Sequence, residues 1–182
     1  LRELAETRVH TGPWEVAALR ILDLDHYDIQ ESYTPVVGPS FYCNSKQSLF
    51  RPDVERFRRR ILERYRSPAH RKVLLLIPCS AKKPYSTSKS HRILSEVIQS
   101  VPNSAVIEEL IVTSPLGVVP RELELFYPAA QYDIPVTGHW DKEEVAMVQQ
   151  MVKHVAGLGF ETVICHLGNE REFVGEAVSC TD

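Results

Sequence analysis

The sequence lacks any apolar run of the roughly 18 residues that a membrane-spanning helix needs. It also lacks a signal peptide at its start, LRELAETRVH, and the GxGxxG, P-loop and HExxH patterns. These absences leave membrane, nucleoside-triphosphate and common metalloprotease functions without support. We therefore expect no membrane partner and no cofactor.

Cysteine is scarce, and its spacing is not that of common metal or redox motifs. A zinc site would need ligands from distant segments, so we expect no bound metal. A disulfide framework would be unusual for this pattern, and a cytoplasmic location that keeps the thiols reduced suits it better. The cysteines are Cys43, Cys79, Cys165 and Cys180.

Acidic residues are missing from one long segment, with no Asp or Glu between Arg64 and Ser95. The stretch from Arg51 to Arg92 carries a net charge of +10, whereas the whole chain carries −3. A basic patch on an acidic body is typical of a protein that contacts a defined phosphate path, and the alternative is a solvated arginine-rich helix. The predicted RNA-contact residues are Arg56, Arg59, Arg60, Lys82, Lys89 and Arg92.

The first third of the chain predicts helices over Leu1–Val9, Pro13–Leu24 and Pro52–Tyr65, with a turn-rich linker over residues 23–48. In the second helix the apolar positions that recur at helical spacing are Trp14, Ala17, Ala18, Ile21 and Leu22. In the third they are Val54, Phe57, Ile61 and Tyr65. We expect a mainly helical N-terminal portion over residues 1–66. The chain does not begin with Met, which favours a fragment or a processed chain.

The remainder alternates strands and helices. Expected strands cover Val73–Ile77, Ala105–Thr113 and Thr162–Leu167, with a short extended piece at Gln131–Val136. Helices are expected through Leu94 and Ile98, over Asp141–Val155 and after Gly168, with a helical turn from Pro120. Apolar strands alternating with helices predict a parallel sheet covered on both faces, an α/β core over residues 67–182 in three layers.

The densest chemistry lies in PCSAKKPYSTSKSH, which follows the first expected strand. Nearby lysines or a protonated His91 are expected to lower the pKa of Cys79 and make it a nucleophile. The alternative is a buried, inert cysteine at a strand end. Lys83 is a candidate anion clamp, and Tyr85 can stack, donate a proton or simply pack. Ser88 belongs to a serine-rich run that suits a helix N-cap.

Further polar residues follow the other expected strands, in TSPLGVVPRELE, YDIPVTGHWD and HLGN. Asp133 is an acid/base candidate, and an Arg–Asp structural pair is an open alternative. Because the carboxyl ends of parallel strands meet at one edge, the sequence predicts a pocket there. Its expected substrate-binding residues are Ser114, Arg121, Glu122, His139 and Asn169.

Three of these motifs, PCSAKKPYSTSKSH, TSPLGVVPRELE and YDIPVTGHWD, resemble the archaeosine synthases, archaeal tRNA-modifying relatives of the tRNA-guanine transglycosylases. The resemblance covers roughly residues 70–182. It implies a uracil-DNA-glycosylase-like fold and an amidine-forming transferase that acts on 7-cyano-7-deazaguanine in the tRNA D-loop. An amine donor adds to the nitrile; lysine is favoured, with a radical-SAM partner that cleaves the adduct, and glutamine is the alternative.

By this resemblance Cys79 is the thioimide-forming nucleophile, and our reading of the residues adds Lys83 as electrostatic aid and His91 or Asp133 as proton donor. Tyr85 and Ser88 complete the predicted catalytic set. Family members also carry a transglycosylase-like barrel and a PUA domain, which this length cannot hold, so a companion domain or chain is expected. Two rivals remain: a non-catalytic tRNA-binding or docking module of a split enzyme, and a thiol-dependent base hydrolase that uses Asp133.

Overall fold

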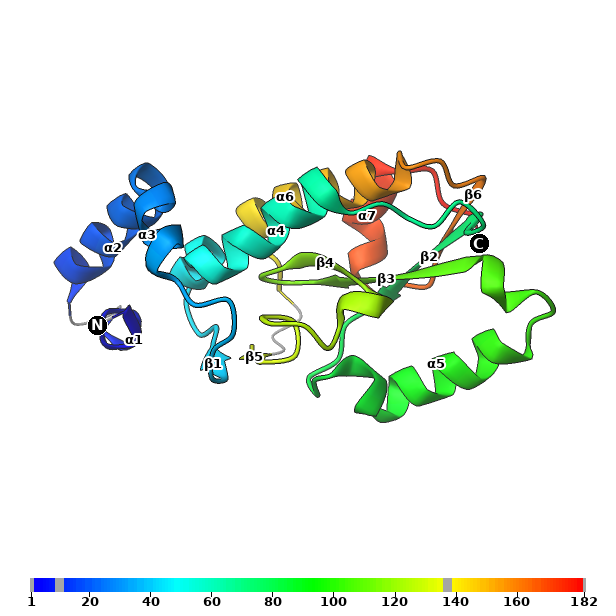
Figure 1. Ribbon diagram of the computed structural model, residues 1–182, viewed down its shortest axis with the longest axis horizontal. Coiled ribbons are helices and arrows are strands. Elements are labelled where there is room, and N and C mark those ends of the chain that lie inside the picture. The colour runs from blue at the N-terminus through cyan, green and yellow to red at the C-terminus, as the bar shows by residue number, and fades with distance from the viewer. Residues whose placement is uncertain (1, 9–11, 136–138, 182) are drawn as a thin grey trace.

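The computed structural model describes residues 2–8, 12–135 and 139–181 (Figure 1). The helices are α1 (Arg2–Thr7), α2 (Pro13–Asp25), α3 (Tyr27–Tyr33), α4 (Pro52–Arg64), α5 (Lys89–Ser100), α6 (Lys142–Ala156) and α7 (Glu170–Ala177). The strands are β1 (Phe41–Tyr42), β2 (Val73–Pro78), β3 (Ile107–Thr113), β4 (Gly117–Pro120), β5 (Tyr132–Asp133) and β6 (Thr162–Cys165). Within these ranges no helix is both long enough and apolar enough to cross a membrane.

The main sheet has the order β4-β3-β2-β6. Its strands β3, β2 and β6 are parallel, as predicted, with Val73 opposite Ile107 on one side and Thr162 on the other. The fourth strand corrects the prediction, because β4 runs antiparallel to β3. Only three residues separate β3 from β4, and a parallel return needs a crossover of about a dozen or more. Gly117, at φ +78°, provides the left-handed conformation at this reversal.

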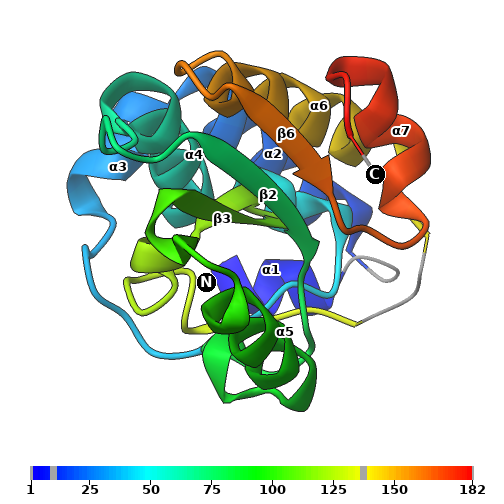
Figure 2. The ribbon, with the colours of Figure 1, turned by 90° about the vertical axis from the view of Figure 1, so that its right-hand side faces the viewer.

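Helices lie on both sides of this sheet, so the α/β architecture with helical layers is confirmed (Figures 1 and 2). On one side α4, α6 and α7 pack closely against it. On the other side lies α5, whose single buried residue is His91. The central core joins strand residues to apolar residues of α4 and α6: Leu74, Leu76, Leu110, Val112, Val54, Phe57, Ile61, Val148, Met151, Val152 and Val155.

Helix α4 is part of this core. It starts with Pro52 in the first turn, a favourable place for proline, and it buries the predicted stripe of Val54, Phe57, Ile61 and Tyr65. Each such side chain contributes roughly 1.5–3 kcal/mol when fully buried. Helix α4 therefore packs against the α/β core, and Arg56 and Arg59 also join it to α3.

Helix α2 turns a different face inward from the one its sequence pattern indicates. The structure buries Val16, Leu19 and Asp23, while Trp14 is 83% exposed. The reason is a polar cluster: Arg2 Nη1 donates to Asp23 Oδ2 at 2.9 Å, and Arg2 Nη2 donates to Gln30 Oε1 at 3.0 Å. These bonds join α1, α2 and α3 and fix which side of α2 they cover.

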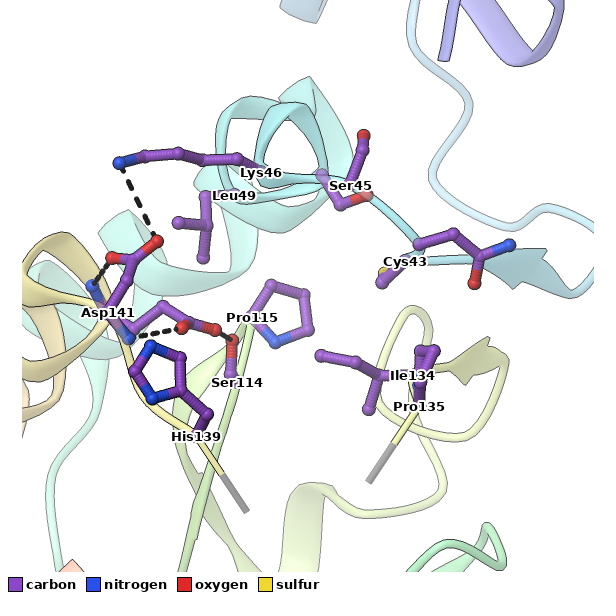
Figure 3. A pocket seen from close by; sticks show the side chains of 13 residues that line it. Cys43, Ser45, Lys46, Leu49, Ser114, Pro115, Ile134, Pro135, His139 and Asp141 are labelled. Carbon is purple, nitrogen blue, oxygen red and sulfur yellow. Dashed lines mark hydrogen bonds and ion pairs between the residues drawn. The ribbon is translucent and has the colours of Figure 1, made fainter. Parts of the chain in front are cut away.

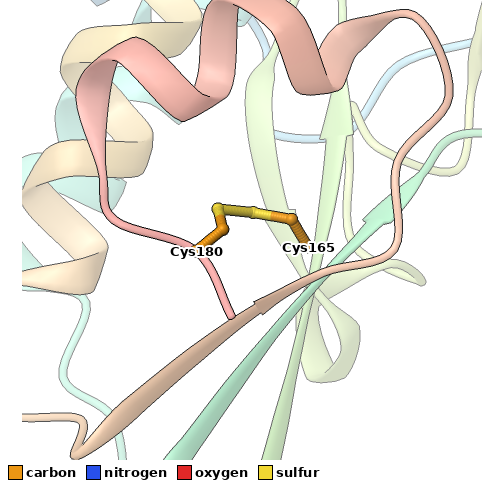
Figure 4. Close-up of a disulfide and its surroundings, with 2 residues drawn as sticks. All are labelled: Cys165 and Cys180. Carbon is orange, nitrogen blue, oxygen red and sulfur yellow. A yellow bond between two sulfur atoms is a disulfide. The ribbon is translucent and has the colours of Figure 1, made fainter. Parts of the chain in front are cut away.

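The cysteines do not all remain free. Cys165, at the end of β6, forms a disulfide with Cys180 after α7, so the expectation of reduced thiols is wrong for this pair (Figure 4). The tail lies beside β6 through an isolated bridge between Ile164 and Thr181, which brings the two Cα atoms to 5.6 Å, within disulfide range. Cys43 and Cys79 are free thiols.

Candidate active site

The polar segments after β2, β3 and β6 lie at one edge of the main sheet, as predicted. Pairing continues past the strands, since the Cys79 N–H donates to the Val112 carbonyl at 3.2 Å and the His166 N–H donates to the Leu76 carbonyl at 2.9 Å. The segment 41–43 adds a further wall to this edge. β1 pairs in parallel with β5, and the Cys43 N–H donates to the Asp133 carbonyl at 2.7 Å.

A chain of buried hydroxyls leads to the Cys79 thiol. The Tyr85 and Tyr132 hydroxyls are 2.5 Å apart, and the Tyr132 hydroxyl is 2.6 Å from Thr113 Oγ1. Thr113 in turn hydrogen-bonds the thiol of Cys79. Burial raises the pKa of both tyrosines, so they stay protonated and serve as hydrogen-bond donors.

Cys79 is not the low-pKa thiol that the sequence predicts. Burial raises its pKa, while the Thr113 hydrogen bond and the positive charge of Lys83 act in the other direction. The carboxylate of Glu170, at the start of α7, adds to the increase. Burial outweighs the nearby charges, so Cys79 is mainly a protonated thiol near neutral pH.

Lys83 is close enough to Cys79 and Asp133 for the charges of both to act on it. Its Nζ is 4.1 Å from the centre of the Tyr132 ring, a cation–π distance. Burial lowers the pKa of Lys83, and the charges of Cys79 and Asp133 oppose that change. A lowered pKa increases the fraction of neutral amine, the form that accepts a proton. Lys83, Tyr132 and Asp133 share the wall of a cavity of about 270 Å³.

A second cavity, of about 200 Å³, opens on the other side of Cys43 and contains both predicted residues Ser114 and His139 (Figure 3). Ser114 Oγ donates to Glu144 Oε1 at 2.5 Å. Asp141 caps α6 by accepting from the Glu144 N–H at 3.0 Å, while Glu144 Oε2 accepts from the Asp141 N–H at 2.9 Å.

Charges of both signs line this cavity. Burial disfavours the Asp141 carboxylate, but the hydrogen bonds from the Glu144 and Glu143 N–H groups and the charge of Lys46 prevail and lower its pKa. Lys46 Nζ lies 3.6 Å from Asp141 Oδ2. The cavity can therefore receive a small molecule that carries both an ammonium and a carboxylate group.

His91 is held in a structural position. Its Nε2 is 3.0 Å from the Pro78 carbonyl and its Nδ1 is 2.8 Å from Arg121 Nη2. Because Arg121 can only donate, Nδ1 accepts and the Nε2–H donates. Burial, followed by the charge of Arg121, lowers the His91 pKa to about 4. The expected protonated His91 beside Cys79 is therefore wrong, because near neutral pH the ring keeps a single proton, on Nε2, and donates it to the Pro78 carbonyl.

Several other predicted residues also hold the fold. Ser88 is the N-cap of α5 and accepts from the His91 N–H at 3.2 Å, which confirms the capping interpretation. Arg121 pairs with Glu109 at 2.7 Å and with Glu124 at 2.9 Å, so its structural partners are glutamates and not Asp133.

Two predicted substrate-binding residues lie away from both cavities. Glu122 accepts from the Tyr65 hydroxyl at 2.9 Å, near the opposite end of β3. Asn169 is exposed and precedes α7 without forming a side-chain cap. Its neighbour Glu170 is the residue whose charge reaches Cys79.

The predicted RNA-contact residues divide into two groups. Arg56 is buried and donates to the carbonyls of Glu31 and Pro35 at 2.7 and 3.0 Å, so we remove it from the set. Arg59 pairs with Glu55 at 2.9 Å and lies over the Tyr27 ring. The remaining members are exposed: Arg60, Lys82, Lys89 and Arg92.

Sequence reasoning missed several residues that surround Cys79 and the cavities. Tyr132 stands beside the predicted Asp133, yet its contact with Tyr85 spans 47 positions. Thr113 ends β3 directly before Ser114, and a polar residue at a strand end was the available signal. Nothing in the sequence brings Cys43 to this edge, because it arrives through the two-residue strand β1.

Fold and site together define an α/β domain that presents a thiol and an amine at the carboxyl edge of its sheet. Residues 54–182 match the family described as Domain of unknown function (DUF5591), and the chain belongs to this family. The structure is also similar to the crystal structure of AF0587, a protein of unknown function, with a TM-score of 0.50 and 34% identity over 69% of this chain and 41% of that one. That likeness supports the α/β fold.

Curated relatives confirm the resemblance seen in the motifs. Archaeosine synthase subunit alpha of Methanosarcina acetivorans is 41% identical over 98% of this chain and 28% of its own length. Its counterpart in Thermococcus kodakarensis is 44% identical over 84% of this chain and 26% of its own length. The tRNA-guanine(15) transglycosylase of Methanocaldococcus jannaschii is 31% identical over 79% of this chain and 20% of its own length. The chain thus spans about a third or less of the curated relatives it matches.

Proposed function

We propose that this chain is the catalytic core of a tRNA-modifying enzyme of archaeosine biosynthesis, a transferase that adds an amine donor to the nitrile of 7-cyano-7-deazaguanine in tRNA. The names of its relatives support the pathway. The observation that carries the chemistry is Lys83, an amine with a lowered pKa, whose charge acts on the free thiol of Cys79.

The first step is a proton transfer from the Cys79 thiol to Lys83, in the fraction of molecules whose Lys83 amine is neutral, a fraction that its lowered pKa increases. It produces a thiolate and an ammonium group side by side, each stabilised by the other's charge. The hydrogen bond from Thr113 stabilises the thiolate further. Proton transfer to Lys83 explains how a buried thiol with a raised pKa acts as a nucleophile. The negative charge on Cys79 forms together with the positive charge on Lys83, so neither charge is buried alone.

The thiolate then attacks the nitrile carbon. A C–S bond forms, one π pair moves to nitrogen, and the Lys83 ammonium group donates its proton there, giving a thioimide. The donor amine next attacks the same carbon, the C–S bond breaks, and the proton lost by the donor returns to Cys79 through Lys83. The product is an amidine, both catalytic groups are restored, and no oxidant or reductant is needed.

Lysine is the donor we favour, and glutamine is the alternative. The exposed carboxylate of Asp133 borders the cavity that contains Lys83 and can hold a donor ammonium group. The second cavity offers Asp141 and Glu144 for an ammonium and Lys46 for a carboxylate. A free amino acid carries both groups, which favours it over a simple amine.

The rest of the assembly is proposed from the family resemblance, and the greater length of the relatives leaves room for it. The tRNA is the macromolecular substrate, in a cytoplasmic setting. A companion domain or chain with a transglycosylase-like barrel and a PUA domain supplies further tRNA contacts, and a radical-SAM partner cleaves the lysine adduct.

Mass spectrometry of nitrile-containing tRNA tests the proposal. This chain, restored to its full-length context and supplied with lysine or glutamine, is expected to add the mass of one donor. The Cys79→Ala variant is expected to lose this product, while Lys153→Met, at an exposed position on α6, retains it. Normal product formation by Cys79→Ala would overturn the thioimide mechanism.

A second function is favoured by the burial that raises the Cys79 pKa. A non-catalytic tRNA-docking module would need its exposed basic residues and not the thiol. Under that alternative, alkylation of Cys79 leaves amidine formation by the full enzyme intact, whereas charge removal at Lys82, Lys89 and Arg92 abolishes it. The thiol-dependent hydrolase alternative predicts release of the base, visible in the same mass spectra as an abasic tRNA.

A further inference from the structure

A groove lies between the end of α4 and the segment that follows β4, far from the candidate active site. It has a volume of about 590 Å³ and includes Tyr65 and Glu122. Tyr65 hydrogen-bonds Glu108, the second residue of β3, whereas Cys79 hydrogen-bonds Thr113, the last residue of the same strand. Five residues of strand place these two ends about 16 Å apart. The remaining lining residues are Val36, Val37, Phe57, Arg60, Ile61, Arg64, Arg66, Leu123, Phe126 and Tyr127.

Three exposed arginines line this groove, and within the described residues none of them forms an ion pair with a carboxylate. Arg60 and Arg64 are four residues apart, on one side of α4. Arg66 donates only to backbone carbonyls, those of Tyr65 at 2.6 Å and Glu63 at 3.2 Å. The positive charges of these neighbouring arginines repel one another, and an anion bound between them offsets that repulsion.

The contrast within the same helix is informative. Arg58 pairs with Glu55 at 2.6 Å, and Arg59 pairs with the same carboxylate group at 2.9 Å. Arg56 pairs with Glu31 at 2.5 Å. The earlier arginines of α4 are therefore used within the fold, and those toward its end are available to a ligand.

The groove also presents apolar surface to solvent. Phe126 is 61% exposed, Val36 66% and Val37 73%. An exposed aromatic ring beside cations is the combination that holds single-stranded nucleic acid, because the ring stacks on a base while the arginines contact the phosphates. An A-form duplex would offer phosphates and 2′-hydroxyls but no free base face to Phe126.

The two glutamates that contact the Tyr65 hydroxyl, Glu108 and Glu122, carry less negative charge than two ionised carboxylates would. The Tyr65 hydroxyl lies 3.0 Å from Glu108 and 2.9 Å from Glu122, yet it has one proton and can donate to one carboxylate only. Burial, together with the charge of Glu122, raises the Glu108 pKa to about 7. Near neutral pH the two glutamates therefore carry less than two full negative charges and repel a phosphate less strongly than two ionised carboxylates would.

We propose that this groove binds a single-stranded RNA segment, with Arg60, Arg64 and Arg66 on its phosphates and Phe126 stacked on one base. Only the identity of that RNA, a segment of the tRNA whose nitrile base is modified at Cys79, rests on the proposed function.

Fluorescence anisotropy with a labelled 12-nucleotide oligouridine tests the groove directly. The variant Arg60→Gln/Arg64→Gln/Arg66→Gln is expected to bind at least tenfold more weakly, with the slope of log K against log salt reduced by about two. Phe126→Ala is expected to weaken binding several-fold and leave that slope unchanged. The matched control Arg8→Gln/Lys142→Gln/Lys153→Gln removes the same charge elsewhere and is expected to change affinity less than twofold.

Two results would overturn the proposal. One is equal affinity of the groove variants and the control for oligouridine. The other is tighter binding of a 12-residue polyglutamate, insensitive to Phe126→Ala, which would make the groove a docking site for an acidic peptide. Because these measurements use no nitrile and no donor, they stay valid if Cys79→Ala proves active; conversely, loss of groove binding leaves the Cys79 chemistry standing.

Discussion

The Nζ atom of Lys83 lies 4.1 Å from the centre of the Tyr132 ring, and the hydroxyl of the same tyrosine lies 2.6 Å from Thr113. Thr113 in turn bonds the Cys79 thiol. One tyrosine therefore touches the amine with its ring and the thiol's neighbour with its hydroxyl. The relative position of thiol and amine depends on this side chain, although Tyr132 itself remains protonated and is buried.

Removal of the Tyr132 hydroxyl should destabilise the protein. In Tyr132→Phe the buried hydroxyls of Tyr85 and Thr113 each lose a partner, at a cost of about 1–3 kcal/mol. Urea denaturation followed by circular dichroism measures this loss. Tyr42→Phe, at an exposed position one strand away, is the control and should be neutral. Equal stability of the two variants would mean that the hydroxyl chain contributes nothing.

Lys83 should control the reactivity of Cys79. Its charge favours the thiolate, so Lys83→Met is expected to raise the thiol pKa further and slow alkylation by iodoacetamide several-fold at pH 8. Lys82→Met removes a neighbouring exposed charge and should alkylate Cys79 at the unchanged rate. Peptide mass spectrometry separates Cys79 from Cys43, whose pKa burial raises to about 12. Identical rates in both variants would contradict the pairing.

His91 should make the protein less stable in acid. Its pKa is about 4 in the folded state and 6.5 ordinarily, so the unfolded chain binds more protons between these values. The stabilisation is complete above pH 6.5 and is lost as the pH falls toward 4, by about 2 kcal/mol at pH 5. His91→Gln should lose this dependence, so its Tm relative to that of the wild type should rise between pH 7 and pH 5. A constant difference in Tm between the two proteins would show that His91 does not titrate as described.

Glu108 should act in the opposite direction. Its folded pKa of about 7 exceeds the ordinary 4.5, so the folded state binds more protons in this window. Its contribution is present below pH 4.5 and is lost as the pH rises through 7. Glu108→Gln should therefore gain stability relative to wild type at pH 7.5 and less so at pH 5. Glu96→Gln, exposed on α5, serves as the control and should show no such trend.

The pH ranges in which His91 and Glu108 change the stability of the protein overlap, and the two residues change it in opposite directions. The wild-type Tm should therefore vary little between pH 5 and pH 7, and the two dependences become visible only in the variants. A steep wild-type profile would indicate a third group that outweighs both.

Much of the α/β core could be predicted from the sequence, because its strands are short apolar runs and its helices carry one apolar stripe. β4 could not be predicted: GVVP stands between prolines and reads as a loop, and only the reversal after Thr113 makes it a strand. The face of α2 also eluded prediction, because the partner of Asp23 is Arg2, in a different helix.

Site residues could be predicted where a reactive or polar side chain follows the end of a strand, as for Cys79, Lys83 and Ser114. They could not be predicted where a residue's role depends on a distant partner. From the sequence, His91 and Arg121 are two separate candidates for functional residues. In the structure they hydrogen-bond each other across 30 positions, and both stabilise the fold. The arginines of α4 look alike in sequence, and only Glu31 and the Pro35 carbonyl, far upstream, reveal that Arg56 is internal.

The short strand β1 has a consequence for any definition of the smallest working unit. The family match begins at Val54, but residues 40–49 supply the upstream walls of the cavity that contains Lys83 and of the cavity that contains Ser114. A protein cut at Val54 would keep the sheet, the thiol and the amine while the backbone of Tyr132 and Asp133 lost its partner strand. The segment matched by the family and the segment that encloses both cavities therefore have different boundaries, and a fragment that keeps both cavities has to start before Ser40.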